Sequence, residues 1–385
     1  MARLGDIGKI ITGNTPKTSE IENYSSNDIC FVKPSDILES DITYVKDSEF
    51  YISELARDKA RILPPQSILV TCIGIIGKVA INQAECAFNQ QINAIIPNLN
   101  TCVPNYLAYA IQYKKNEIQG IANAAVVPIL NKTQFSDIEV NLPQLDEQLK
   151  IAAVLDKLTG LISLRKQQLA KLDEVVKARF VEMFGDPMRN PLEWPIHQLQ
   201  EYILFLTSGS RGWAQYFTNS GEYFITIKNV KNCRVTLDDV QYVIPPNDAE
   251  AKRTKVEEGD LLISITADLG RTGVITKEIA DYGAYINQHL TCIRLDRKAL
   301  HPLYVAYYME SEAGKTQFRL KNQNGVKAGL NFNAINSLNL MVPPLERQNY
   351  FVDFVAKMER QKLTIQQSLD KLEVLRKSLM QEYFG

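Results

Sequence analysis

The chain has 385 residues, of which 45% are hydrophobic and 23% are charged, and its formal net charge at pH 7 is −1. This composition is typical of a globular chain with two or three domains. It excludes a strongly basic polypeptide. Phosphate contact needs only a local basic face, however, so the net charge does not decide whether nucleic acid is a partner.

The sequence gives no sign of a membrane segment, a secretion signal or a metal site. Its longest apolar runs, such as SILVTCIGII, are too short and too interrupted to cross a bilayer, and MARLGDIGK lacks the apolar core of a signal peptide. The cysteines form no CxxC pair and lie mostly in apolar stretches, as reduced, buried thiols do. They are Cys30, Cys72, Cys86, Cys102, Cys233 and Cys292. We expect a cytoplasmic protein with no membrane contact, metal or cofactor.

In chain order, the first 140 residues predict short strands and one helix. The β-branched runs DIGKIIT, ICFV, SILVTCIG, KVAI and QINAII are separated by Gly, Pro and Asn turns, and a helix is expected at residues 104–119. A similar series returns later as YFITI, DLLISIT, TGVIT and HLTCIRL, followed by a helix expected at residues 302–318. Both regions therefore read as mixed α/β globular parts.

A duplication relates the two halves of the chain. LPQLDEQ at residues 142–148 matches VPPLERQ at residues 342–348, which gives an offset of 200 residues. From residue 143 to residue 185, 12 of 43 positions are identical to their partners, where unrelated sequences would share roughly two or three. The identical positions are Pro143, Leu145, Gln148, Lys157, Gln167, Leu169, Lys171, Leu172, Lys177, Glu182, Phe184 and Gly185. Two copies of one unit therefore make up the chain.

The duplicated segments predict two long helices that pair with each other. Apolar residues alternate three and four positions apart, which is the seam of a coiled coil. The predicted seam residues are Leu155, Leu158, Ile162, Leu169, Leu172, Val176, Val355, Met358, Ile365, Leu369, Leu372 and Leu379. Each helix would run about 38 residues, or roughly 57 Å. Antiparallel pairing fits a chain that must return across a whole domain; a helix packed on its own domain is the alternative.

Catalytic motifs are missing from the sequence. We find no phosphate-binding GxxxxGK[ST], no GxSxG and no HExxH, and the histidines His197, His289 and His301 are far apart. No Pro-Pro pair has the neighbours that an amino-methylating enzyme needs. Glu250 and Lys252 match an ExK nuclease pattern that is common by chance. The sequence therefore predicts a protein that is not an enzyme.

Taken together, these features resemble the specificity (S) subunit of type I restriction–modification systems. The resemblance covers the whole chain and is strongest at the twin P-x-L-x-x-Q phrases and at the FG pairs of residues 184–185 and 384–385. The Gly-rich turn with Thr-Pro that often begins such domains is matched by GNTPKT at residues 13–18. The second copy has TSGSRGW at residues 207–213 instead, which indicates that the two domains read different bases.

The resemblance implies an α+β fold with an internal pseudo-twofold repeat, in which two mixed α/β target-recognition domains are joined by two long antiparallel helices that form a coiled coil. The expected parts are recognition domain 1 at residues 1–142, a central spacer helix at 143–185, recognition domain 2 at 186–342 and a C-terminal spacer helix at 343–385. Each domain would read one half of a bipartite double-stranded DNA target, and the helices would set the gap. The subunit would dock two methyltransferase (M) subunits and, through them, restriction (R) subunits.

Base reading requires polar side chains on loops that enter the major groove, with Arg or Lys suited to guanine and Asn or Gln to adenine. In domain 1 the candidate DNA-binding residues are Thr15, Lys17, Lys33, Lys78, Asn89 and Gln90. In domain 2 they are Ser210, Arg211, Trp213, Lys228, Arg271, Asn287, Gln288 and Lys327. Any of these could instead cap a turn, and for Asn89 and Asn287 a cap at a strand end is a strong alternative.

Two other classes of function were weighed against this one. A solitary DNA methyltransferase needs cofactor and amino-group motifs, which this sequence lacks. A non-enzymatic coiled-coil scaffold that joins two protein-binding modules fits the near-neutral charge, and the residues by themselves leave it open.

Overall fold

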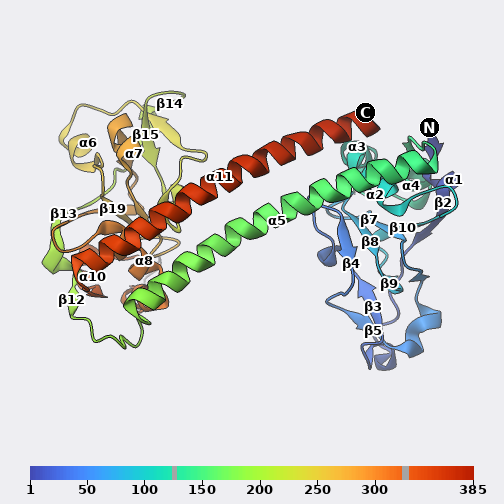
Figure 1. Cartoon of the computed structure of the whole chain (residues 1–385), viewed down its shortest axis with the longest axis horizontal. Helices are drawn as coiled ribbons and strands as arrows, with labels where there is room; N and C mark the ends of the chain where they lie inside the picture. Colours follow the sequence, from blue (N-terminus) through green and yellow to red (C-terminus); the bar gives the residue numbers. More distant parts are fainter. Residues whose placement is uncertain (124–127, 323–328) are drawn as a thin grey trace. The chain divides into compact units, whose positions relative to one another are not determined.

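A computed structural model describes residues 1–123, 128–322 and 329–385 of the chain. It contains two compact units that do not follow chain order. Unit 1 comprises Met1–Gln167 and Gln366–Gly385, and unit 2 comprises Gln168–Ile365. Each unit therefore holds one globular domain together with part of each long helix (Figure 1).

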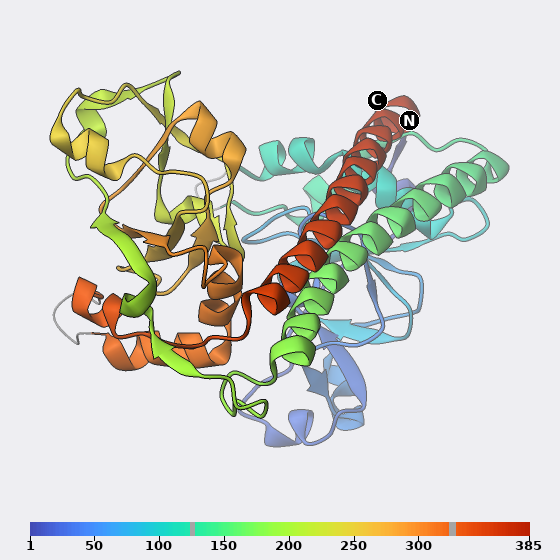
Figure 2. The ribbon, with the colours of Figure 1, turned by 60° about the vertical axis from the view of Figure 1, so that its left-hand side comes forward.

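The two long helices are α5 (Leu145–Phe184) and α11 (Leu345–Phe384), each of 40 residues. They begin 200 residues apart, as the duplication predicts, and are slightly longer than expected. Unit 1 contains the N-terminal part of α5 and the C-terminal part of α11, whereas unit 2 contains the other two parts, so the helices run antiparallel (Figure 2). The predicted fold class and the pairing of the helices are confirmed.

Every predicted seam residue of the helix pair is buried or half-buried. Leu155, Leu158, Ile162, Val176, Val355 and Leu369 are buried, and Leu169, Leu172, Met358, Ile365, Leu372 and Leu379 are half-buried. Ion pairs flank this seam within each unit. Lys166 of α5 lies 3.3 Å from Glu373 of α11 in unit 1, and Lys362 of α11 pairs with Asp173 of α5 in unit 2.

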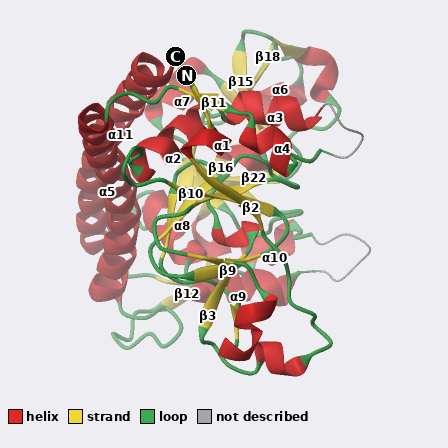
Figure 3. Ribbon diagram, turned by 90° about the vertical axis from the view of Figure 1, so that its right-hand side faces the viewer, coloured by secondary structure: helices red, strands yellow, loops and turns green. Residues whose placement is uncertain are grey.

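The domain of unit 1 is built from short strands and short helices around its core (Figure 3). Its strands are β1 (Ala2–Arg3), β2 (Gly8–Thr12), β3 (Ile29–Val32), β4 (Thr43–Val45), β5 (Tyr51–Ile52), β6 (Ile62–Leu63), β7 (Ile68–Thr71), β8 (Val79–Asn82), β9 (Cys86–Phe88), β10 (Ile92–Pro97) and β11 (Glu139–Val140). Its α-helices are α1 (Leu4–Ile7), α2 (Pro104–Tyr113), α3 (Lys115–Asn123) and α4 (Lys132–Ser136). Its 3₁₀ helices are η1 (Ile21–Tyr24), η2 (Pro34–Asp36) and η3 (Glu54–Lys59).

The domain of unit 2 contains a similar series. Its strands are β12 (Ile196–Gln198), β13 (Ile203–Ser208), β14 (Phe217–Thr218), β15 (Glu222–Ile225), β16 (Val230–Lys231), β17 (Cys233–Val235), β18 (Gln241–Val243), β19 (Leu261–Ser264), β20 (Thr272–Val274), β21 (Ala284–Ile286), β22 (Leu290–Leu295) and β23 (Asn339–Met341). Its α-helices are α6 (Ala249–Thr254), α7 (Lys277–Tyr282), α8 (Pro302–Glu310), α9 (Glu312–Lys321) and α10 (Phe332–Asn336). Its 3₁₀ helices are η4 (Leu199–Tyr202), η5 (Trp213–Tyr216) and η6 (Ile227–Asn229).

The sheets of the two domains share one topology. Domain 1 has a main sheet in the order β2-β10-β7-β8-β4, and the main sheet of domain 2 begins β13-β22-β19-β20-β17 in the same way. In both sheets only the last of these pairings is parallel, β4 with β8 and β17 with β20. A second sheet also matches, because β3 pairs in parallel with β9 and β15 with β21. The duplication therefore extends through the globular parts, where the sequence similarity is weak.

The helices expected at residues 104–119 and 302–318 are each broken in two. The first is interrupted at Lys114, where α2 ends and α3 begins, and the second at Ser311, between α8 and α9. Ser311 has extended backbone angles, and its side chain accepts a hydrogen bond from the backbone N–H of Gly314. It therefore caps a new helix rather than continuing the old one.

The twin Gln residues of the repeated phrase make the same hydrogen bonds in both units. The Oε1 atom of Gln148 accepts from the N–H of Val103 (2.9 Å), and its Nε2 donates to the carbonyls of Thr101 and Pro143. Gln348 repeats this arrangement with His301, Ala299 and Pro343. Both side chains are 0% exposed. The phrase thus fixes the start of each long helix to the loop that precedes α2 in unit 1 and α8 in unit 2.

The FG pairs anchor the other ends of the long helices. Phe184 at the end of α5 packs against Tyr304 of α8 and Phe351 of α11, with ring centroids 4.8 and 5.7 Å apart. Phe384 at the end of α11 packs against Tyr106 of α2 at 5.2 Å. Each domain therefore holds the first turns of one long helix and the last turns of the other.

Among residues 1–123, 128–322 and 329–385, no helix has the length and apolarity that a membrane span needs. All six cysteines are free thiols, and all but Cys30 are buried. Burial raises the pKa of Cys72 to about 11 and those of Cys86 and Cys102 to about 12, which keeps these thiols protonated.

Candidate nucleic-acid interface

In domain 1, two turns that are distant in sequence meet at the end of the main sheet. The N–H of Gly13 donates to the carbonyl of Ile92, and the N–H of Asn14 donates to the carbonyl of Phe88. A Cβ on Gly13 would lie 2.1 Å from the carbonyl oxygen of Asn89, so only glycine fits there. The turn after β2 therefore lies directly on the turn between β9 and β10. We call this pair of turns the reading edge of the domain.

Domain 2 builds the same reading edge from a different sequence. The N–H of Gly209 donates to the carbonyl of Leu290, and the N–H of Ser210 donates to that of Ile286. A Cβ on Gly209 would lie 2.1 Å from the carbonyl oxygen of Asn287. The TSGSRGW turn therefore occupies the place of the GNTPKT turn, although the two share almost no residues.

The structure brings several predicted site residues together at these edges. In domain 1, the Thr15 hydroxyl donates to Oε1 of Gln90 (2.6 Å), and both residues are exposed. In domain 2, the N–H of Gln288 donates to the carbonyl of Ser210. Arg211 and Lys17 are exposed on the two turns, with Lys17 3.9 Å from Glu20.

The two predicted asparagines use their side chains to shape the turns. Oδ1 of Asn89 accepts from the N–H of Gln91 (3.1 Å), and Oδ1 of Asn287 accepts from the N–H of His289 (3.2 Å). These contacts cap the turns, as the alternative to base contact predicts.

Other predicted residues are engaged within their own domain. The Lys78 ammonium donates to the carbonyls of Pro34 and Ile37 (2.9 Å each), and the Lys33 ammonium lies 3.0 Å from the centroid of the Phe50 ring. Since these contacts are internal, the two ammonium groups fix the loop around η2.

In domain 2, Trp213 is 3% exposed and packs among Tyr216, Phe224 and Tyr285. Its indole therefore belongs to an aromatic core beneath the reading edge.

The remaining predicted residues of domain 2 are placed as follows. Lys228 is exposed on η6, and Arg271 forms an ion pair with Asp268 on the loop before β20. Lys327 lies outside the described residues. Glu250 and Lys252 of the ExK pattern lie on the short helix α6, and among the described residues no group of three or more His, Cys, Asp and Glu side chains is placed to hold a metal ion.

Two arginines that the sequence analysis missed lie at the reading edges. Arg61 donates from its guanidinium to the carbonyl of Thr12, the last residue of β2. Arg253 donates to the carbonyl of Ser208, the last residue of β13, at 2.7 Å. Arg61 directly precedes strand β6, whereas Arg253 lies within helix α6, so the two arginines belong to different elements. Their similarity is seen only in the structure, where both guanidiniums donate to the carbonyl of the last residue before the Gly turn.

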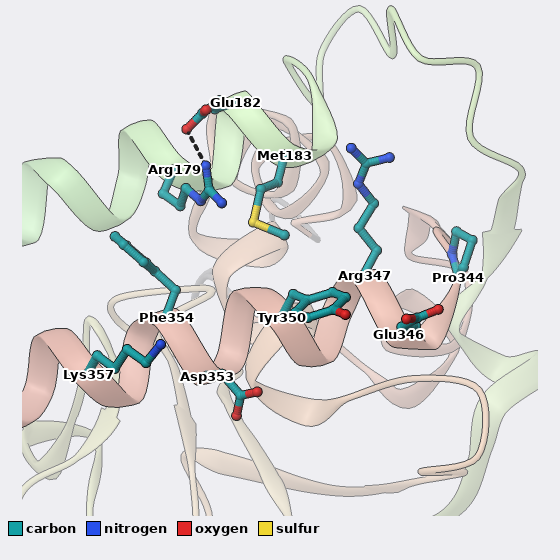
Figure 4. A pocket seen from close by; sticks show the side chains of 10 residues that line it. All are labelled: Arg179, Glu182, Met183, Pro344, Glu346, Arg347, Tyr350, Asp353, Phe354 and Lys357. Carbon is teal, nitrogen blue, oxygen red and sulfur yellow. Dashed lines mark hydrogen bonds and ion pairs between the residues drawn. The ribbon is translucent and has the colours of Figure 1, made fainter.

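A groove runs between the two long helices in unit 2 (Figure 4). It has a volume of about 790 Å³, and side chains of both signs line it together with aromatic rings. Phe354 of α11 lies under the guanidinium of Arg179 of α5, 5.6 Å from it, and Tyr350 is 63% exposed. An exposed aromatic ring within a charged rim is typical of a protein-binding surface.

The fold and its two reading edges define a class: a protein with two loop-presenting domains on one pair of helices. A family model described as the type I restriction modification DNA specificity domain matches residues 1–174 and 208–374. The chain belongs to this family. It is a DNA specificity subunit of a type I restriction–modification system and a non-catalytic member of that complex. This assignment sets aside the scaffold and methyltransferase alternatives.

Individual relatives agree with this assignment. The chain is 30% identical over 249 residues to the type I restriction enzyme MjaIX specificity subunit of Methanocaldococcus jannaschii, covering 59% of this chain and 57% of that protein. It is 22% identical to the StySPI specificity subunit of Salmonella potsdam over 100% of this chain and 88% of that protein. The type I restriction-modification S subunit from M. genitalium has a similar fold, with a TM-score of 0.57 at 12% identity over 100% of this chain and 95% of that chain.

Proposed function

We propose that each domain reads one half of a bipartite, asymmetric DNA sequence through its reading edge. The observation that carries the proposal is that the same edge is built twice, with Gly13 against the Asn89 turn in domain 1 and Gly209 against the Asn287 turn in domain 2. The two domains are joined by long helices of equal length. Different side chains project from the two edges, so the two half-sequences differ. Duplex DNA has its own pseudo-twofold symmetry, which suits a reader with a pseudo-twofold repeat.

The exposed side chains at the edges set the chemistry of reading. Gln90 offers an amide that suits adenine, and Arg211 offers a guanidinium that suits guanine in the major groove. Lys17, Lys228 and Arg271 supply positive charge near the edges. We expect Arg211→Ala and Arg271→Ala to change the recognised bases in only one half-sequence, and Lys17→Ala in only the other.

The paired helices α5 and α11 act as the spacer that sets the gap between the half-sequences. They also dock two methyltransferase subunits and, through them, restriction subunits. In unit 2 the groove of Figure 4 supports such docking, because Tyr350 and Phe354 present aromatic area between charged residues of both helices. We place the complex in the cytoplasm, where the DNA of a bacterial or archaeal cell is found.

The test is to express the chain with its methyltransferase partner in a host that lacks the modification and to map methylated bases across the genome. We expect one asymmetric motif made of two short sequences separated by a fixed number of unspecified base pairs. A single uninterrupted motif, or methylation without sequence preference, would contradict the proposal. The pure chain incubated with S-adenosylmethionine and DNA serves as the control and should show no turnover.

Docking is tested separately by Tyr350→Ala, which removes the exposed ring without touching the reading edge. We expect weaker retention of the methyltransferase subunit in size-exclusion chromatography. The matched control is Lys150→Ala at the same position of the other helix. Equal retention by both variants and the unchanged chain would remove the groove from the docking surface.

A further inference from the structure

The guanidiniums of Arg61 and Arg253 hold the same point of the two reading edges. Each donates to the carbonyl of the last residue of the strand that leads into the Gly turn, Thr12 in β2 and Ser208 in β13. Arg253 also donates to the hydroxyl of Thr207. The turn that carries the reading side chains is therefore tied to an arginine in both domains.

The segments that carry these arginines are joined to the turns by a second contact. In domain 1, Oδ1 of Asn14 accepts from the N–H of Arg61 (2.8 Å), and its Nδ2 donates to the carbonyl of Lys59 (2.8 Å). In domain 2, the hydroxyls of Ser210 and Thr254 lie 3.0 Å apart. Asn14 and Ser210 each follow the turn glycine, so the second contact is also duplicated with different residues.

Both arginines retain capacity for a further ligand. Arg61 is an exposed residue, and the side chain of Arg253 is 43% exposed. A guanidinium has five N–H donors in a planar fork, so it can bond a carbonyl and an anion at the same time. Glu250 forms an ion pair with Arg253 at 3.9 Å, which is too far for a hydrogen bond.

The surroundings of Arg253 favour an anionic ligand. A pocket of about 380 Å³ opens beside it, lined by Lys252, Lys255, Arg294 and the acidic Glu257. Lys255 pairs with Glu222, and Arg294 pairs with Glu257 and Asp260, so Lys252 and Arg253 supply the positive charge for a further anion. Lys252 is exposed on α6, next to Arg253 in the chain. A backbone phosphate of DNA that lies along the reading edge has the charge and the size for this place.

We propose that Arg61 and Arg253 are positioning residues, each of which bridges a DNA backbone phosphate to the turn that reads the adjacent bases. Phosphate contacts fix the register of a protein on the duplex, while base contacts supply the specificity. An arginine that holds both the turn and a phosphate couples these two functions, because it fixes the position of the turn relative to the phosphate that it binds. The proposal rests on the proposed function of the reading edges.

The test uses the full chain in complex with its methyltransferase subunits and a duplex that carries the mapped target. Binding is measured over a range of salt concentrations, against duplexes altered in one or the other half-sequence. Gln in place of Arg61 or Arg253 removes the charge, and Lys keeps the charge but loses the fork. Arg57→Gln is the control, because Arg57 lies nearby on η3 and is bound by Glu54 and Glu85 rather than by the turn.

We expect each Gln variant to lose one phosphate contact, which lowers the slope of log affinity against log salt by about 0.9. Discrimination should fall about tenfold at the half-sequence of the same domain and stay unchanged at the other. The Lys variants should keep the salt slope but lose discrimination, and the control should change neither. A salt slope that is unchanged in the Gln variants, with or without a lower melting temperature, would overturn the proposal and leave a purely structural role. If the unaltered complex itself ignores changes in one half-sequence, the proposed function fails instead.

Discussion

The two units attach their domains to the long helices through equivalent strands but with different interactions. Unit 1 uses hydrogen bonds from neutral donors, and unit 2 uses ion pairs. In unit 1, the Asp156 carboxylate of α5 accepts hydrogen bonds from Tyr44 (3.1 Å), Asn105 (2.7 Å) and Tyr109 (2.8 Å). All three donors are neutral. Burial, and then the nearby Asp156, raise the pKa of Tyr44 to about 12, so its hydroxyl stays a donor at physiological pH.

In unit 2, alternating charges replace these neutral donors. Arg234 of β17 pairs with Glu359 of α11 and lies 3.8 Å from Asp173 of α5, and Lys362 pairs with both acidic residues. Arg234 stands where Tyr44 stands in unit 1, since each is the second residue of the strand that pairs in parallel with the fourth strand of the main sheet.

The comparison shows that the topology of the junction was kept while its residues changed. A half-buried carboxylate is satisfied as well by three neutral donors as by cations, provided that each polar group finds a partner. The position of Lys362 makes the same point, because its duplicated partner is Ile162, which is 1% exposed. One seam position thus holds an apolar side chain in unit 1 and a buried ammonium, 8% exposed, in unit 2.

Lengthening the spacer should have the largest effect on both units. Seven residues added after Gln167 and again after Gln367 keep the seam continuous and add about 10.5 Å to each helix. We expect both half-sequences to be retained while the gap grows by at most about three base pairs at roughly 3.4 Å each. Methylome mapping measures the gap.

The same seven residues placed in only one helix should abolish methylation, because the two domains then impose different registers on the pair. A doubly lengthened chain that still methylates at the original gap would show that the helices are not the spacer.

Replacing the Gln of the repeated phrase should lower the stability of both units by a similar amount. Gln148→Leu and Gln348→Leu each delete the three hydrogen bonds of a fully buried side chain and remove the partner of one backbone N–H, that of Val103 or His301. We expect each change to lower the free energy of unfolding by about 2–4 kcal/mol. Urea denaturation followed by circular dichroism checks this, and a loss in only one of the two variants would break the equivalence of the junctions.

Variants in the charged network of unit 2 should show a smaller difference in stability between the units. Asp173→Ala leaves the Lys362 ammonium buried with Glu359 as its remaining acidic partner within the network, and we expect a loss of about 1–3 kcal/mol, reduced by the partial exposure of Asp173. Lys362→Met should be close to neutral, because an apolar side chain of similar volume fits a seam position. The control is Glu373→Ala in unit 1, whose partner Lys166 is 46% exposed and can return to water. A larger loss for Lys362→Met than for Asp173→Ala would contradict this account.

The smallest expected difference is in acid stability. Burial, and then Arg297, lower the pKa of His301, which stands before α8 where Val103 stands before α2. The unfolded chain binds this proton more readily, so unit 2 loses stability as the pH falls below about 6.5 and is unaffected above it. His301→Val should remove the dependence, an effect of less than about 1 kcal/mol. Both tryptophans, Trp194 and Trp213, lie in unit 2, so fluorescence-monitored unfolding at pH 7.5 and pH 5.5 reports on that unit. An identical pH dependence in the His301→Val chain would show that another group is responsible.

Much of the fold follows from patterns that are local or strictly periodic. The three-and-four spacing predicted the long helices and their seam, and the offset of 200 residues predicted that they match. Short β-branched runs between Gly, Pro and Asn turns predicted the central strands β7, β10, β19 and β22. The breaks at Lys114 and Ser311 were missed, because an apolar face continues across them and only the local backbone and capping contacts end the helix.

The site was less predictable, because its residues act through partners that are distant in sequence. The Gly-rich turns were identified through the family resemblance, and Asn89 and Asn287 as candidate DNA-binding residues. The structure shows the Gly turn and the Asn turn of each domain in contact. The charge of Lys78 predicted a role at the surface, yet its ammonium is held by two carbonyls of another loop. Arg61 and Arg253 were not predicted, because they lie on different elements and have in common only the backbone carbonyl position to which they donate.

The sequence by itself determined the duplication, the length and phase of the long helices and the presence of the Gly-rich turns. These features depend on spacing along the chain or on the absence of a side chain, and both can be read without knowing the neighbours. Only the tertiary structure decided which polar residues line the reading edges, which cations are held internally, and how Tyr44 in one unit and Arg234 in the other perform the same attachment. Hydrogen bonds and ion pairs depend on positions in space, and unlike residues can satisfy the same partner once the fold has brought them together.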